Sequence, residues 1–226
     1  DVNVELMGLL SAIKTSPESF LHEATVLVDQ YLLLQTKEAR KAWYYQQRQR
    51  YWETPSPGLL FVLMRLGFNG IWQTCAASNG LFGTPAGLLN QTTAGQIVDA
   101  ASVSAWSLAM QSVDIVTGDY SNVKLPETPA LIYLDPPYRD SFTTYGTVFG
   151  DEEQTRVAQW AMAAADAGHK VLFANRATET DTFFEVLMAA VFDFHYVNVV
   201  YTAGRRKKTD DGFEAKAARE FLAVSK

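Results

Sequence analysis

Leu131-Ile132-Tyr133-Leu134-Asp135-Pro136-Pro137-Tyr138 is the stretch from which the architecture of this chain can be inferred. Its first four residues form an apolar run typical of a buried strand. The two prolines that follow can neither continue a helix nor donate ladder hydrogen bonds, so they hold the backbone extended just beyond the strand. Open α/β sheets bind their ligands at this place. We therefore predict an α/β fold with a functional site at residues 135–138.

The same tetrapeptide indicates a chemistry. An amino group conjugated to a purine ring is a poor nucleophile, and acceptors that bind its hydrogens pull the nitrogen toward tetrahedral geometry. Asp135 offers a carboxylate and Pro136 a backbone carbonyl for this purpose, and Tyr138 offers a flat face on which an extruded base can stack. The pattern favours methyl transfer onto an exocyclic amine. The alternative is a proline turn after a buried strand, with an aromatic residue that caps the core.

Composition limits the class of protein. A chain of 226 residues with 48% hydrophobic content can bury a substantial core. Its one cysteine, Cys75, excludes an intramolecular disulfide and fits a reducing cytoplasm, and its three scattered histidines indicate no metal site. No apolar run reaches the roughly 18 to 20 residues that a membrane span needs. We expect a cytoplasmic protein that binds neither metal nor membrane.

The charge pattern permits a nucleic-acid partner despite a formal net charge of −6. Neutralising phosphates requires clustered lysine and arginine, and the chain has two such clusters. They are Lys37, Arg40, Lys41, Arg48 and Arg50, interleaved with aromatic residues, and Arg205-Arg206-Lys207-Lys208, which is typical of a loop. The alternative for each cluster is a solvated helix or loop face.

The apolar periodicity predicts helices in the first half of the chain and alternating strands and helices in the second. The predicted helices are 4–14, 18–35, 37–52, 59–66, 96–110, 151–167 and 179–190, and the predicted strands are 112–117, 131–134, 170–174, 194–202 and 219–224. Strands separated by helices imply a largely parallel sheet. Between them, the glycine-rich segment 69–95 is too long for an idle connector, and such loops usually carry function.

A series of short motifs occurs in the order found in one known family. The motifs are Asp1-Val2-Asn3, Tyr45 with Arg48 and Tyr51, Phe68-Asn69-Gly70, Gly80-Leu81-Phe82-Gly83-Thr84-Pro85-Ala86-Gly87, Gly118-Asp119-Tyr120, Asp135-Pro136-Pro137-Tyr138, Phe142-Thr143-Thr144-Tyr145, Ala174-Asn175, and Arg205-Arg206 with Arg219-Glu220-Phe221-Leu222. In these motifs the chain resembles the Dam-like DNA adenine-N6 methyltransferases, which use S-adenosylmethionine. The resemblance is collinear and covers most of the chain.

The resemblance implies an architecture. It is a largely parallel Rossmann-like methyltransferase sheet with an inserted, mainly helical target-recognition lobe. Residues 1–15 and 112–226 would form the catalytic domain, and 16–111 the inserted lobe. The implied partner is double-stranded DNA, as in the site-specific enzymes of restriction-modification systems.

The resemblance also implies site residues. S-adenosylmethionine would bind at Asp1, Val2, Asp119, Tyr120 and Asp135, and catalysis would rest on Asp135, Pro136, Pro137 and Tyr138. The residues implied to contact DNA are Tyr138, Tyr145, Arg48, Asn69, Gln73, Asn79, Arg205 and Arg206. For Asp119 the alternative is a turn or helix cap, and for Asn175 it is the end of a strand.

The chain departs from the family pattern in two places. The family's Lys-containing opening and its Phe-x-Gly-x-Gly loop occur nowhere in the sequence, and there is no initiator methionine. We therefore expect a fragment, a processed product, or one of two chains that together complete the enzyme. The second departure is in the recognition segment, which has two more residues between Gly70 and Gly80 than the family has and lacks its arginine. Because arginine reads guanine, we expect a different or relaxed recognition sequence.

Two other function classes remain open. The chain could be a catalytically inactive or incomplete DNA-binding relative. The absence of the family's Phe-x-Gly-x-Gly loop favours this alternative, and the intact Asp-Pro-Pro-Tyr tetrapeptide opposes it. It could instead be an amino methyltransferase acting on cytosine N4 or on a glutamine amide, because similar Pro-Pro motifs activate those amines too. Aspartate at position 135 favours adenine.

Overall fold

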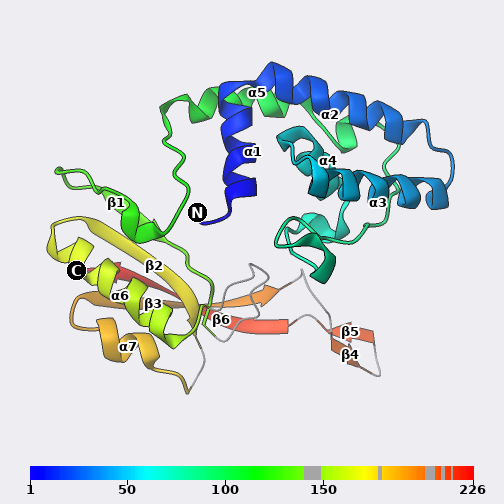
Figure 1. Ribbon diagram of the computed structural model, residues 1–226. Coiled ribbons are helices and arrows are strands. Elements are labelled where there is room, and N and C mark those ends of the chain that lie inside the picture. The colour runs from blue at the N-terminus through cyan, green and yellow to red at the C-terminus, as the bar shows by residue number, and fades with distance from the viewer. Residues whose placement is uncertain (140–148, 178–179, 202–206, 210–211, 215) are drawn as a thin grey trace. The chain divides into compact units, whose positions relative to one another are not determined.

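The computed structural model describes residues 1–226 apart from 140–148, 178–179, 202–206, 210–211 and 215, and between 201 and 217 it describes at most the backbone (Figure 1). The chain divides into two compact units. The first, the helical unit, is Asp1–Val123, and the second, the sheet unit, comprises the described residues from Lys124 onward. The predicted assignment of residues 16–111 to an inserted recognition lobe stays a prediction.

The helical unit has five α-helices with clear start signals in the sequence. Pro17 and Pro57 occupy the first helical position, where a missing amide hydrogen costs nothing. The side chains of Asn3, Thr36 and Asp99 cap three other helices by accepting a hydrogen bond from a first-turn amide. The helices are α1 (Val4–Thr15), α2 (Pro17–Leu32), α3 (Lys37–Glu53), α4 (Pro57–Leu66) and α5 (Ala100–Ala109).

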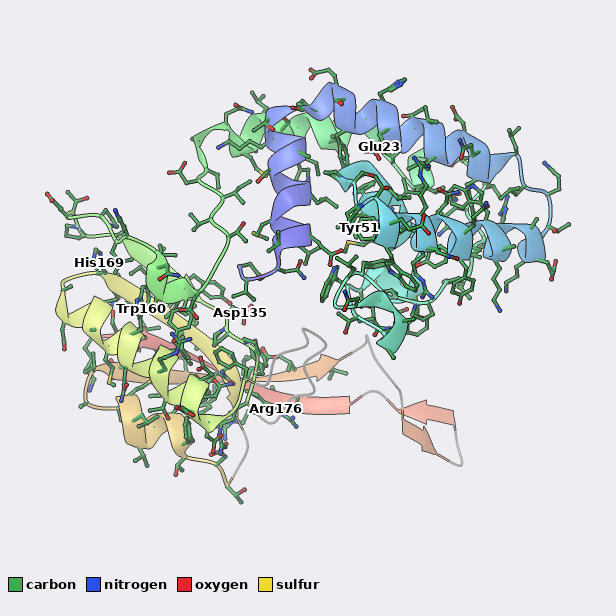
Figure 2. All side chains as sticks on the ribbon, in the orientation of Figure 1. Glu23, Tyr51, Asp135, Trp160, His169 and Arg176 are labelled. Atoms are coloured by element: carbon green, nitrogen blue, oxygen red, sulfur yellow. The ribbon has the colours of Figure 1, made fainter. Side chains whose placement is uncertain are left out.

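The core of this unit is built around α4. Six of its ten residues are buried, and it packs against α1, α2 and α3. The carboxylate of Glu23 on α2 accepts hydrogen bonds from the Ser56 hydroxyl and, at 3.0 Å, from the Gly58 amide (Figure 2). Because these groups lie at the start of α4, Glu23 supplies the cap that the Ser56 side chain does not.

The sheet unit contains a four-stranded sheet in the order β1-β2-β6-β3. Helix α6 packs against β2 and α7 against α6. The elements are β1 (Leu131–Leu134), α6 (Asp151–Asp166), β2 (Lys170–Ala177), α7 (Phe183–Met188), β3 (Phe192–Tyr201) and β6 (Lys216–Ser225), with a separate ribbon of β4 (Lys207–Thr209) and β5 (Gly212–Glu214).

The prediction of a largely parallel sheet was wrong for the sheet that the structure describes. Strand β1 pairs with β2 in parallel, from Leu131 opposite Lys170 to Leu134 opposite Phe173. Strand β6, however, lies antiparallel to both β2 and β3. Residues 221–224 of β6 form a continuous apolar run, which is more typical of strands in parallel sheets, so the sequence of this strand did not reveal that it runs against its neighbours.

Four element predictions also need correction. The strand at 131–134 is not buried as predicted: it is at the edge of the described sheet, and Leu131 and Tyr133 are 69% and 60% exposed. Residues 113–117 form no strand, and Val113 and Val116 are exposed. The helix predicted at 96–110 begins at Ala100, because Asp99 caps it. The basic segment predicted as a loop lies partly in a strand, since Lys207 and Lys208 begin β4.

Two features are absent from the part of the chain that the structure describes. No helix in it is both long and apolar enough to cross a membrane. No group of histidine, cysteine, aspartate and glutamate side chains in it could hold a metal ion.

Candidate active site

The Asp-Pro-Pro-Tyr segment lies where the backbone leaves β1. Leu134 is the last residue of that strand, and Asp135 follows it as an exposed side chain (labelled in Figure 2). Residues 136–139 are half-buried. The predicted catalytic residues are therefore at the carboxyl end of a strand with a parallel neighbour, the position expected for a ligand site in an α/β sheet.

The carboxylate of Asp135 has an unusual electrostatic environment. Partial desolvation raises its pKa above the ordinary value of 3.8, and the negative charge of Glu220 on β6 raises it further. A hydrogen bond from the Tyr138 side chain acts in the opposite direction. A carboxylate with a raised pKa is a better acceptor for the hydrogens of an amine. Tyr138, predicted to stack on a base, thus also contacts the carboxylate that would bind the amine.

Behind this segment lie two buried amide side chains, Gln154 on α6 and Asn175 on β2. Both are fully buried. The Gln154 amide donates a hydrogen bond of 2.7 Å to the Pro137 carbonyl and accepts one of 3.3 Å from Asn175. The Asn175 carbonyl oxygen accepts from the amides of Arg139, at 3.0 Å, and Arg176, at 2.8 Å. We call Gln154 and Asn175 the amide pair.

Arg139 ends the segment with a set of ionic contacts. Its guanidinium forms a two-pronged ion pair with Asp151 at the start of α6, at 2.8 and 3.0 Å. It also bonds to Asp181 at 2.5 Å and lies 4.4 Å from the centre of the Phe183 ring. These contacts hold the guanidinium in its charged form, with its pKa raised, and lower the pKa of Asp151.

Sequence reasoning missed Gln154 and Arg139. Gln154 shares the buried face of α6 with Val157, Ala158 and Ala161. A polar residue at helical spacing with three small apolar ones is a usable signal, because a buried amide needs hydrogen-bond partners. Asn175 belongs to one of the sequence motifs, but its partners could not be inferred from the sequence.

The residues predicted to bind the cofactor nucleoside meet in the helical unit. The Gly118 amide donates to the Asp1 carbonyl at 2.9 Å, which brings Asp1 and Val2 beside Asp119 and Tyr120. Asp119 accepts hydrogen bonds from the amide and hydroxyl of Ser121, so it also has the turn-capping role that was its alternative. Asp135, the fifth predicted cofactor residue, belongs to the sheet unit.

Arg48, predicted to contact DNA, supports the glycine-rich loop. Its guanidinium donates to the carbonyls of Gly83 and Thr84 at 2.8 and 3.0 Å. Tyr44 and Trp52 lie about one turn before and one turn after Arg48 on α3. Tyr44 also donates to the Thr84 carbonyl, at 3.0 Å, and Trp52 donates to the Phe82 carbonyl, at 2.8 Å. Side chains spaced four residues apart share a helix face, so α3 presents a row of three donors to this loop.

The other predicted DNA residues have varied positions. Asn69 and Asn79 are exposed and adopt positive φ of 52° and 48°, which asparagine tolerates better than most residues. Gln73 is half-buried, and its backbone carbonyl accepts a hydrogen bond of 2.6 Å from the Gly83 backbone amide. Tyr145, Arg205 and Arg206 lie outside the described residues. A DNA role for these residues stays a prediction.

Comparison with known proteins identifies the class of enzyme. A model of the D12 class N6 adenine-specific DNA methyltransferases matches residues 1–203. The match spans both units, so the chain belongs to this family and is an adenine-specific DNA methyltransferase. Among curated proteins no relative matches it.

Proposed function

We propose that this chain transfers the methyl group of S-adenosylmethionine to N6 of an adenine extruded from double-stranded DNA, in the bacterial or phage-infected cytoplasm. The observation that carries the proposal is the position of Asp135 and Pro136 at the carboxyl end of β1 in a chain matched by the adenine-specific family. Adenine methyltransferases act on an amine that is inaccessible within the duplex, which requires the base to leave the stack.

The helical unit contains donors and acceptors that fit the nucleoside end of the cofactor. Asp1 is an exposed carboxylate able to accept hydrogen bonds from a ribose diol, and Val2, 56% exposed, offers an apolar contact for an adenine ring. Asp119 and Tyr120 lie beside them through the bond between Gly118 and Asp1. Bound there, S-adenosylmethionine would supply an activated, electrophilic methyl group.

The residues of the chain act mainly by orientation. Asp135 and the Pro136 carbonyl accept the two amine hydrogens, so the nitrogen lone pair is directed away from them. Desolvation and Glu220 raise the pKa of Asp135, which strengthens its bond to the amine and prepares it to receive a proton from the methylated nitrogen. Positioning of this kind can supply much of a rate enhancement.

Incubation of the purified protein with isotopically labelled S-adenosylmethionine and DNA duplexes tests this proposal. One set of duplexes contains adenine and no cytosine, the other contains cytosine and no adenine, and digested DNA is analysed by mass spectrometry. We expect N6-methyladenine, which Asp135→Ala abolishes and Asp166→Ala, an exposed control at the end of α6, leaves unchanged. Methylation of cytosine, or full activity of Asp135→Ala, would refute the assignment.

A further inference from the structure

The Asp-Pro-Pro-Tyr segment requires support that its own backbone cannot give. The strand pairing of β1 with β2 ends at Leu134 opposite Phe173. Pro136 and Pro137 have no amide hydrogen, so the segment cannot continue the ladder. Yet a displacement of about 1 Å at a reacting group can cost on the order of a hundredfold in rate. Side chains must therefore fix the far end of the segment.

We propose that Gln154 and Asn175 are the positioning residues of methyl transfer in this enzyme. The proposal rests on the proposed function and assigns to the amide pair the task of holding the Pro137 carbonyl and the Arg139 amide. With β1 fixing Leu134 on one side and the amide pair fixing residues 137 and 139 on the other, the Asp135 carboxylate and Pro136 carbonyl are held between two anchors.

The geometry gives each amide one orientation. The Asn175 oxygen accepts from two backbone amides, so its NH2 group must face Gln154. The Gln154 oxygen accepts from this group, which directs the Gln154 NH2 group to the Pro137 carbonyl. Both side chains are fully buried, so water cannot replace a lost partner and each bond constrains the next. The second strand of the sheet is thereby connected through a helix to the catalytic segment.

The decisive experiment replaces Gln154 by two residues of similar size. Gln154→Glu keeps the shape of the side chain, and Gln154→Met removes its hydrogen bonding. At high pH the Gln154→Glu carboxylate repels the Pro137 carbonyl. Burial raises the pKa of a carboxyl group, so the introduced glutamate should become protonated as the pH falls. The protonated side chain can donate a hydrogen bond to the Pro137 carbonyl as the Gln154 amide does. We expect kcat of Gln154→Glu to be about 10- to 100-fold below wild type at pH ~8.5 and to recover as the pH falls.

Further readouts separate positioning from a merely structural role. Gln154→Met should lose kcat by a similar factor at every pH, with KM for DNA and cofactor affinity within a few-fold of wild type. A ratio of Gln154→Glu to wild-type kcat that does not change with pH, or a fully active Gln154→Met, would overturn the proposal. Each rate is referred to wild type at the same pH, so titration of Asp135 cancels.

If Gln154→Met does not fold, Asn175→Asp replaces it. This variant keeps the acceptor for the Arg139 amide but loses the donor to Gln154, so kcat should fall while Arg139 stays bonded. Hydrogen exchange of the Arg139 amide needs no activity. It should accelerate at least tenfold in Asn175→Ala and remain slow in Asn175→Asp. Equal exchange rates in the two variants would contradict the proposed role of Gln154 and Asn175. Because this measurement does not depend on methylation, it separates a failure of that role from a failure of the proposed function.

Discussion

The Gly118 amide donates a 2.9 Å hydrogen bond to the carbonyl of Asp1, and the amino nitrogen of Asp1 donates to the Val116 carbonyl at 3.1 Å. The two bonds lie on either side of Thr117, which is the pattern of a parallel strand pair. Segments separated by 115 positions in the sequence are thus joined by backbone alone. The predicted ribose ligand Asp1 and the predicted adenine ligand Asp119 are brought together by this contact.

Asp119→Asn tests the cofactor role of this region. The asparagine oxygen can still accept the two bonds from Ser121, so the turn should survive, but the negative charge that would attract an adenine amino group is lost. We expect binding of S-adenosylmethionine, measured by calorimetry, to weaken about 5- to 10-fold, equivalent to about 1 to 1.4 kcal/mol. The thermal unfolding midpoint should not change. Unaltered affinity would leave Asp119 with the turn-capping role alone.

Arg48→Met tests whether Arg48 supports the loop. The methionine retains much of the packing against Tyr45 and Trp52 but loses the bonds to the carbonyls of Gly83 and Thr84. We expect the free energy of unfolding in urea to fall by about 1–2 kcal/mol. Arg50→Met, on the same helix and exposed, should change it by less than about 0.5 kcal/mol. Equal stability of the two variants would argue that Arg48 is available for DNA.

Gly83→Ala tests the close approach of two parts of the glycine-rich loop. A Cβ atom at position 83 would lie 2.5 Å from the Cys75 backbone nitrogen, so the loop must shift to admit it. We expect a loss of about 1–3 kcal/mol in the free energy of unfolding. Gly95→Ala serves as the control, because its Cβ would meet open space and should be neutral or slightly stabilising. A stable Gly83→Ala would show that the loop adapts.

The close approach of Gly83 to Cys75 connects two features of the resemblance to the Dam-like enzymes. By that resemblance, Gly83 stands where their Gly-x-Phe-Asn loop has asparagine, and the segment between Gly70 and Gly80 is two residues longer than theirs. Cys75 belongs to the longer segment and lies where a side chain at position 83 would have to be. The two differences, separate in the sequence, are one packing arrangement in the structure.

The fold was predictable where a local signal determines it. Pro17 marks a helix start through the fixed φ of proline, and it occupies the first helical position of α2. The helix predicted from residue 59 begins two residues earlier, because Pro57 fills the same role in α4. The direction of β6 has no such signal, because its side chains depend on burial and not on which way the neighbouring strand runs.

In the candidate site, too, residues with a local sequence signal were predictable and long-range contacts were not. Asp135 could be located from the prolines that follow it, whereas the partners of Asn175 depend on long-range contacts. Its bond to Gln154 spans 21 positions and that to Arg139 spans 36. Arg48 shows the converse, since a basic residue among aromatic ones can bind phosphate or backbone carbonyls, and only the structure shows the carbonyls.

The pH dependence of methylation should report the environment of Asp135. If the ionised carboxylate binds the amine, activity falls as the pH drops through the pKa of Asp135, which lies above 3.8. Glu220→Gln removes a charge that raises this pKa, so the acidic limb of kcat/KM should move to lower pH. Tyr138→Phe removes a bond that lowers the pKa, so the limb should move to higher pH. General destabilisation would not be expected to move the acidic limb in opposite directions for two substitutions that both act on Asp135. Shifts in the same direction, or none, would mean that Asp135 does not govern the acidic limb.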